Sequence, residues 1–175
     1  MKKTTSILVI AFAFICSSVF SQATLKPFRA GHEFNISIPD YMIRTVGLND
    51  VAIFQYKNDV KDVYGFVIED NKEELKIAEL TYTSLTEFYE GFVTDFVKDE
   101  PKRKVSKPIL TTKGEINFIE ADLQYYDKDA EATIYYLIGI VETKDAYYKV
   151  LSWCTEANKA KFKADFQKIV YSIND

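Results

Sequence analysis

Four segments in the second half of the chain alternate between apolar and polar residues, and the connections between them are only a few residues long. The segments cover residues 105–111, 116–126, 133–142 and 146–154. Alternation with a period of two is typical of β-strands, and such short connections favour antiparallel neighbours. The sequence therefore predicts an antiparallel meander, and this pattern constrains the fold more than any other.

One part of the meander is apolar at almost every position. Residues 134–141 carry no charged side chain. A strand with one face in water alternates between apolar and polar residues, whereas a strand buried on both faces does not. Residues 134–141 are therefore predicted to lie in the middle of the sheet, with other elements covering both faces.

Two helices are indicated by apolar residues at helical spacing. The first follows Ser84, which forms a capping box with Glu87, and Pro101 comes after its end. Its apolar stripe consists of Leu85, Phe88, Tyr89, Phe92, Val93, Phe96 and Val97. The second is capped by Thr155, and its apolar face consists of Phe162, Phe166, Ile169, Val170 and Ile173. Both stripes are interpreted as surfaces that face the core.

Further strands and an irregular lead-in are predicted before the first helix. Residues 22–32 have no clear period and are interpreted as a flexible lead-in. Alternating segments predict strands at 34–38, 51–56 and 63–68. Together the elements predict a single domain over residues 33–175. Its expected fold class is α+β, with an antiparallel sheet of about six to seven strands sandwiched by two main helices.

The N-terminus has the three zones of a secretory signal peptide. A positive start at residues 2–3 is followed by an apolar run that ends at Phe20. Small residues then place the predicted cleavage between Ser21 and Gln22. The uninterrupted apolar core of about ten residues is too short to span a membrane, which takes about 20 residues in a helix. Residues 1–21 are therefore predicted to be a signal peptide, and the protein is predicted to be periplasmic or extracellular.

An envelope lipoprotein with a structural role is the alternative for this segment, because Cys16 lies within the apolar run. Lipid attachment requires a small residue just before the cysteine, and Ile15 stands there. Cys16 is therefore interpreted as an ordinary apolar residue that is removed with the signal peptide.

Cleavage would leave 154 of the 175 residues, a length that suits one domain. The signal peptide holds two lysines and no acids, so the remaining chain has 20 basic and 26 acidic residues and a net charge of −6. This balance disfavours nucleic acid as a partner, since that requires concentrated positive charge. Cys154 is then the single cysteine, so no internal disulfide is expected. No second long apolar run follows, so no transmembrane segment is predicted after cleavage.

The order of the elements resembles a known family. The segments that carry the resemblance are an extended stretch closed by proline at 34–39 with Tyr41 after it, the helix start at 84–89, the end of the meander at 147–153, and the end of the last helix at 169–173. Across about residues 31–173 this succession is similar to the PsbP/Mog1-like α/β sandwich. That family includes photosynthetic accessory subunits, GTPase-binding regulators and small secreted bacterial proteins of unknown function. The resemblance implies a non-enzymatic binding or assembly role, and no functional residue of the family matches a position in this chain.

Nucleophilic catalysis needs a nucleophile, a base and an orienting group within hydrogen-bond reach. The single histidine, His32, falls in the predicted lead-in, so most triads and metal sites lack a part. Cys154 stands directly before a predicted helix, whose N-terminus can lower the pKa of a thiol and make it reactive. A buried packing residue is the favoured interpretation of Cys154, and an intermolecular disulfide is a further alternative.

Two groups of acidic residues are candidate sites. Asp127, Asp129 and Glu131 alternate in a predicted hairpin loop, where carboxylates can bind Ca²⁺. This loop lacks the glycine and the distant glutamate of an EF-hand, so whether it binds a metal stays open. Glu120 and Asp122 point to one face of a predicted strand and form a candidate carboxylate pair for hydrolysis. A charged hairpin tip and a solvated strand face explain the two groups without a function.

Basic and aromatic residues also gather locally. The run Lys102-Arg103-Lys104, with Lys107, is a small basic group in an acidic protein and is weak evidence for an anionic partner. Three successive predicted strands each carry a tyrosine pair: Tyr125 and Tyr126, Tyr135 and Tyr136, and Tyr147 and Tyr148. Neighbours in a strand face opposite ways, so each pair gives one ring to each face of the sheet. One set is predicted to be core, and the other is either core beneath a helix or an exposed aromatic strip.

The sequence thus favours an exported, non-enzymatic binding or assembly-accessory module, with an envelope protein or a small ligand as its partner. The alternatives are a hydrolase that uses Glu120 and Asp122 and the lipoprotein described above. No catalytic, cofactor-binding or metal-binding residue and no cofactor is assigned.

Overall fold

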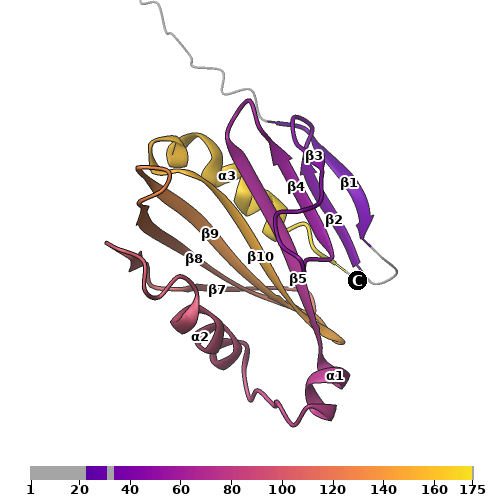
Figure 1. Cartoon of the computed structure of the whole chain (residues 1–175). Helices are drawn as coiled ribbons and strands as arrows, with labels where there is room; N and C mark the ends of the chain where they lie inside the picture. The colour runs from indigo at the N-terminus through magenta and orange to yellow at the C-terminus, as the bar shows by residue number, and fades with distance from the viewer. Residues whose placement is uncertain (1–22, 31–33, 175) are drawn as a thin grey trace, which may run out of the picture.

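The computed structural model describes residues 23–30 and 34–174. The predicted signal peptide with Cys16, and also His32, fall outside the described residues, so their interpretations remain predictions. The described elements form three layers, in which one large antiparallel sheet lies between helices on either side (Figure 1).

Among the described residues, eight strands form the large sheet. In spatial order they are β3 (Ile43–Arg44), β4 (Phe54–Asn58), β5 (Val63–Asn71), β10 (Ala146–Thr155), β9 (Ala132–Glu142), β8 (Ile116–Asp127) and β6 (Lys104–Val105), with β7 (Ile109–Lys113) also paired to β8. The predicted α+β class and antiparallel sheet are confirmed, although the sheet is wider than expected. One reason is that the predicted strand 105–111 is divided into β6 and β7 around Pro108, which has no N–H to donate to β8.

The two faces of the sheet are covered by different elements. Helix α3 (Lys159–Val170) and the paired strands β1 (Leu25–Ala30) and β2 (Phe34–Pro39) pack on one face, and α2 (Leu85–Asp95) packs on the other. A short helix, α1 (Lys72–Ile77), follows β5 at one end of the sheet (Figure 1). The predicted sandwich between two main helices is confirmed.

The predicted flexible lead-in is wrong for residues 25–30. They form β1, which pairs with β2 along its whole length. Phe28 packs on the ring of Phe54, with ring centroids 5.7 Å apart. Pro27 interrupts the periodic pattern of this segment, so the strand depends on its partner and on the docking of Phe28 rather than on a local signal.

Strand β9 shows why the middle of the sheet is apolar on both faces. Tyr135 and Leu137 are buried on the α3 side, and Ile138 and Ile140 are buried on the α2 side. Because β9 lies between β10 and β8, both of its edges are also paired. This confirms the prediction for residues 134–141.

The ends of α2 are held by side chains. Ser84 Oγ accepts a hydrogen bond from the backbone N–H of Glu87 (3.2 Å), as predicted. The Glu87 carboxylate accepts from the N–H and the hydroxyl of Thr83 (both 2.7 Å), one residue before the cap, instead of from Ser84 as in a standard capping box. At the other end, Arg103 Nε donates to the carbonyl of Phe96 (3.0 Å), one of the groups that a helix leaves without an internal partner.

The last helical segment begins after Thr155 with a short 3-10 turn, Glu156–Asn158, and α3 follows it. The predicted cap is therefore incomplete. The Thr155 side chain makes no capping bond to the backbone, and its hydroxyl accepts from Asn158 Nδ2 instead (3.1 Å).

Candidate binding surface

Helix α2 covers only part of the face of the sheet on which it lies. It packs on β8 and β9, and its Phe88 stacks on Tyr147 of β10 with ring centroids 4.3 Å apart. In the described part of the chain, α1 contacts β5 at the far end of this strand, and no α-helix covers the end of β5 near Tyr64 or the end of β10 near Trp153 (Figure 1). Side chains at this end of the face are therefore partly exposed and free of helix cover within the described residues.

Four aromatic side chains cross this region of the sheet, one on each of four strands, and we call them the aromatic row. They are Tyr64 on β5, Trp153 on β10, Tyr136 on β9 and Tyr125 on β8. The strand register places Trp153 directly opposite Tyr64 on one side and Tyr136 on the other. The ring centroids of successive members lie 5.5, 5.3 and 6.2 Å apart.

The rings of the aromatic row pack face to face. The planes of successive rings differ by only 25°, 24° and 21°. Three members are half-buried, and Tyr125 is 9% exposed. Phe66 meets the Trp153 ring at a steep angle with centroids 5.7 Å apart, and Phe96 meets Tyr136 in the same way at 5.3 Å. The row therefore exposes ring edges rather than open ring faces, which suits apolar side chains better than the flat stacking of a sugar or a base.

The structure divides the three tyrosine pairs as the alternation predicts. Tyr135 and Tyr148 are buried in the core on the α3 side. On the α2 side, Tyr147 lies beneath the helix, whereas Tyr136 and Tyr125 belong to the aromatic row. Both alternatives for the second set are thus found, at different ends of the same face.

Sequence reasoning missed two members of the row. Tyr64 and Trp153 are in phase with Phe66 and Leu151 of their own strands, so alternation predicts the face on which they lie. It does not predict that Tyr64 and Trp153 are neighbours, because β5 and β10 are far apart in the sequence.

Carboxylates lie at both ends of the aromatic row. At the β5 end, burial raises the pKa of Tyr64, and the carboxylate of Asp62 raises it further. At the β8 end, burial raises the pKa of Tyr125, and Asp127 again adds to the shift. A nearby carboxylate has this effect because it repels the phenolate. The row thus consists of aromatic rings with a carboxylate beside the first ring and another beside the last.

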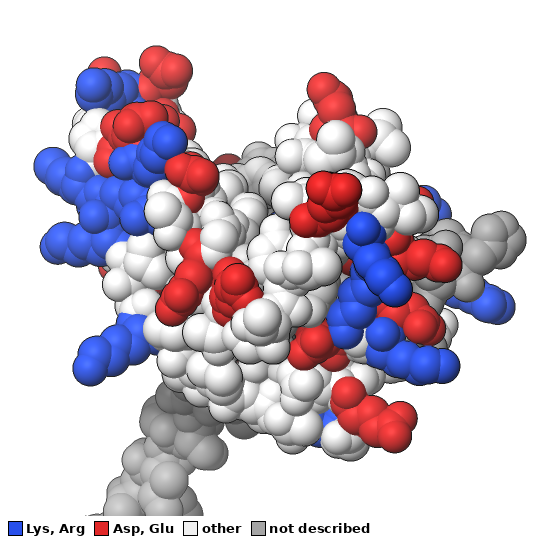
Figure 2. Space-filling view, turned by 90° about the horizontal axis from the view of Figure 1, so that it is seen from below, with Lys and Arg blue, Asp and Glu red and all other residues white. Residues whose placement is uncertain are grey.

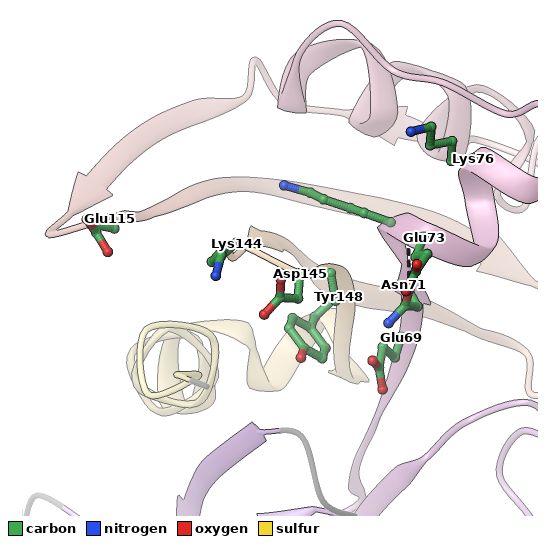
Figure 3. Close-up of a pocket in the computed structure, with 10 residues that line it drawn as sticks. Glu69, Asn71, Glu73, Lys76, Glu115, Lys144, Asp145 and Tyr148 are labelled. Carbon is green, nitrogen blue, oxygen red and sulfur yellow. Dashed lines mark hydrogen bonds between the residues drawn. The ribbon is translucent and has the colours of Figure 1, made fainter.

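A second candidate is a cleft of about 980 Å³ at the end of the sheet that carries α1 (Figure 3). Its charged lining residues are Glu69, Lys72, Glu73, Lys76, Glu115, Lys144 and Asp145. Figure 2 views the molecule from this end and shows Lys and Arg at two opposite sides, with uncharged residues and several Asp and Glu between them. The cleft therefore has no single sign of charge.

Two polar side chains that line the cleft, Lys72 and Asn71, already have partners within the protein. Lys72 Nζ donates to the Glu142 carboxylate (2.9 Å) and to the carbonyl of Thr143 (2.8 Å). Asn71 Oδ1 accepts from the backbone N–H of Glu73 (2.8 Å), which begins α1. In residues 23–30 and 34–174, no group of three His, Cys, Asp or Glu side chains is placed to hold a metal ion. These contacts hold α1 in place, and the aromatic row is the better candidate for binding.

The predicted carboxylate pair lies beneath α3. Glu120 and Asp122 point to the same face of β8, as predicted, but each has a partner on the helix. Glu120 Oε1 accepts from Gln167 Nε2 (2.8 Å). Asp122 Oδ2 forms ion pairs with Lys159 (3.0 Å) and Lys163 (2.8 Å). The two carboxylates thus join β8 to α3.

The environment of Asp122 does not suit an acid catalyst. Burial alone would raise the pKa of Asp122, but hydrogen bonds from Lys163, Lys159 and Tyr135 outweigh it and lower the pKa. A general acid that works near neutral pH needs a raised pKa. The geometry therefore favours a structural role for Asp122.

We expect Asp122→Asn to destabilise the protein by about 1–2 kcal/mol at neutral pH, because Lys159 and Lys163 lose their counter-charge. Folding lowers the pKa of Asp122, so the ionised carboxylate stabilises the protein fully at pH values above its ordinary pKa of 3.8. This stabilisation is lost as the pH falls through the lowered pKa that Asp122 has in the folded protein. Urea unfolding from pH 7 to pH 2.5 should show the two proteins converging in acid. Asp129→Asn, at an exposed loop position, is the control and should leave stability unchanged. If the difference in free energy of unfolding between Asp122→Asn and the unchanged protein stays constant with pH, the ionised carboxylate of Asp122 is not what stabilises the fold.

Cys154 is a packing residue. It is 1% exposed, and burial raises the pKa of its thiol to about 12, with smaller contributions from nearby carboxylates. A thiol with a raised pKa is a poor nucleophile, so the structure supports the favoured interpretation of Cys154 over a reactive cysteine.

The acidic hairpin and the basic run also have local structural roles. Asp127 Oδ1 accepts from the backbone N–H groups of Asp129 and Ala130 (both 2.9 Å), which shapes the turn. Arg103 binds the end of α2, and Lys102 Nζ lies 4.7 Å from the ring centroid of Tyr126. Some residues of the acidic hairpin and of the basic run therefore stabilise the local structure.

Comparison with known proteins supports the fold. No protein-family model matches the chain, and no curated protein sequence is significantly similar to it. The solution structure of cyanobacterial PsbP (CyanoP) from Synechocystis sp. PCC 6803 is similar, with a TM-score of 0.58 and 12% identity over 91% of this chain and 96% of that one. The structure of LpqN, involved in cell envelope biogenesis of Mycobacterium tuberculosis, is similar with a TM-score of 0.52 and 10% identity over 86% and 90%.

Within the described residues, no helix is long and apolar enough to cross a membrane. At 12% and 10% identity, the likeness to these two structures concerns the fold and not the activity. It agrees with the resemblance found in the order of the sequence elements. The chain therefore adopts the PsbP-like α/β sandwich fold.

Proposed function

We propose that the protein is an exported, non-enzymatic module that binds a protein of the cell envelope through the aromatic row. The observation that carries the proposal is that three of these stacked rings, Tyr64, Trp153 and Tyr136, stay half-buried beyond the part of the face that α2 covers. The row continues the apolar cluster beneath α2, to which Tyr136 and Tyr125 belong. Burying the exposed ring edges against a partner is favourable, because apolar surface leaves water.

Three further observations support this function. Residues 1–21 are predicted to be a signal peptide, the kind of segment that directs a protein out of the cytoplasm. Glu120 and Asp122, the pair on which the hydrolase alternative depends, are engaged with α3. One protein of similar fold, LpqN, is involved in cell envelope biogenesis.

A protein partner fits the size of the row better than a small ligand does. Neighbouring strands lie about 4.8 Å apart, so a row across four strands is roughly 14 Å long. One small molecule would cover one or two rings, whereas a segment of about four extended residues would cover all of them.

Site-specific photo-crosslinking in the native host tests the proposal. Lys57 of β4 lies directly opposite Tyr64 in the strand register, so a photo-reactive amino acid at position 57 stands beside the row. The matched control is position 161, an exposed residue of α3 on the other side of the sheet. We expect a discrete adduct from position 57 and none from position 161, and Tyr64→Ala should reduce the adduct severalfold. No adduct at position 57, or equal adducts at both positions, would overturn the proposal.

A further inference from the structure

The protein itself shows how the α2 face of the sheet holds a cation. Lys149 Nζ lies 5.6 Å from the ring centroid of Phe88 and 5.7 Å from that of Phe92. The same ammonium group is 2.7 Å from Asp70 Oδ2, and both side chains are largely buried. An ammonium group beside aromatic rings and a carboxylate is a favourable arrangement, because both partners attract the positive charge.

The aromatic row offers a cation the carboxylates of this arrangement, while its stacked rings present their edges to apolar side chains. In the described part of the chain, no lysine or arginine lies over the ring of a row member. Three lysines near its ends have other contacts: Lys57 Nζ pairs with Asp59 Oδ2 (2.9 Å), Lys61 lies over Tyr41, and Lys102 lies over Tyr126. Asp62 and Asp127 thus place one carboxylate beside the first ring of the row and one beside the last.

We infer that the partner segment bound by the aromatic row is apolar and is flanked by lysine or arginine. Its apolar side chains pack on the ring edges, and its cations reach the carboxylates of Asp62 and Asp127. This inference rests on the proposed function and specifies the chemistry of the partner. A segment flanked by acidic residues meets like charge at both ends, which is unfavourable.

The single tryptophan of the chain, Trp153, lies in the row and reports binding through its fluorescence. The probe is a synthetic peptide of alternating leucine and lysine, and the matched peptide has glutamate in place of each lysine. We expect saturable binding of the lysine peptide and at least tenfold weaker binding of the glutamate peptide. Raising the salt concentration from about 0.05 M to about 0.5 M should weaken binding of the lysine peptide severalfold, because salt screens exposed charges.

The double variant Asp62→Asn, Asp127→Asn tests the two carboxylates. Asparagine keeps the oxygen that accepts the turn hydrogen bonds at position 127, and it tolerates the positive φ of 53° at position 62. We expect the double variant to bind the lysine peptide about three- to tenfold more weakly than the unchanged protein does. The matched control, Asp40→Asn with Glu115→Gln, removes two exposed charges elsewhere and should have less than a twofold effect.

The outcomes separate this inference from the proposed function. Equal binding of the two peptides, no binding of either, or an equal loss in the control double variant would overturn the inference. If Asp62→Asn, Asp127→Asn leaves the adduct at position 57 unchanged in the host while Tyr64→Ala removes it, the row binds a partner that is not cationic. If Tyr64→Ala also leaves the adduct unchanged, the proposed function itself fails.

Discussion

Gly139→Ala is expected to lower the free energy of unfolding by about 1–3 kcal/mol, although it adds a single methyl group. Gly139 lies in the middle of β9, beneath α3. A Cβ atom at this position would lie 2.4 Å from Cγ2 and 2.7 Å from Cγ1 of Val170. Val170 is itself fully buried, so the helix must move away from the sheet or the strand must bend. Urea unfolding followed by circular dichroism measures the loss.

Two controls make the Gly139 prediction specific. Gly91→Ala adds the same methyl group on the exposed side of α2, where the nearest atom is 4.0 Å away, and should stabilise the protein by about 0.5–1 kcal/mol. In a Val170→Ala background the two closest atoms are gone, so Gly139→Ala should cost clearly less than it does alone. Equal costs in both backgrounds would show that contact with Val170 is not the cause.

The second large effect is expected from Tyr56→Phe. The hydroxyl groups of Tyr56 and Ser152 form a hydrogen bond of 2.7 Å, and both residues have 0% exposure. Removing the Tyr56 hydroxyl leaves the hydroxyl of Ser152 buried without this partner, which costs about 1–3 kcal/mol. Burial also raises the pKa of Tyr56, so the phenol stays neutral and the loss should not change between pH 6 and pH 9.

A double-mutant cycle isolates this hydrogen bond. Ser152→Ala alone should destabilise the protein for the same reason as Tyr56→Phe, because each single change leaves one buried hydroxyl unpaired. The double variant leaves neither hydroxyl, so it should be more stable by about 1 kcal/mol or more than the sum of the single losses implies. Additive losses would mean that the two hydroxyl groups do not stabilise each other.

The binding surface was only partly predictable from the sequence. The tyrosine pairs predicted aromatic rings on both faces of the sheet, and the register of β8 and β9 shows that Tyr136 and Tyr125 are the two that share a side. Trp153 and Tyr64 were not predicted as members because their contact depends on the pairing of β10 with β5. The ion pairs of Asp122 depend in the same way on the docking of α3.

The sequence by itself determined the main strands and helices and the face of each that is buried. These features depend on local periodicity, since an apolar residue every second or every three to four positions marks the side that faces the core. Tertiary structure alone decided the formation of β1 and the composition of the aromatic row. The physical reason is that alternation specifies the face of a sheet on which a side chain lies, whereas its neighbours depend on which distant strands pair and in what register.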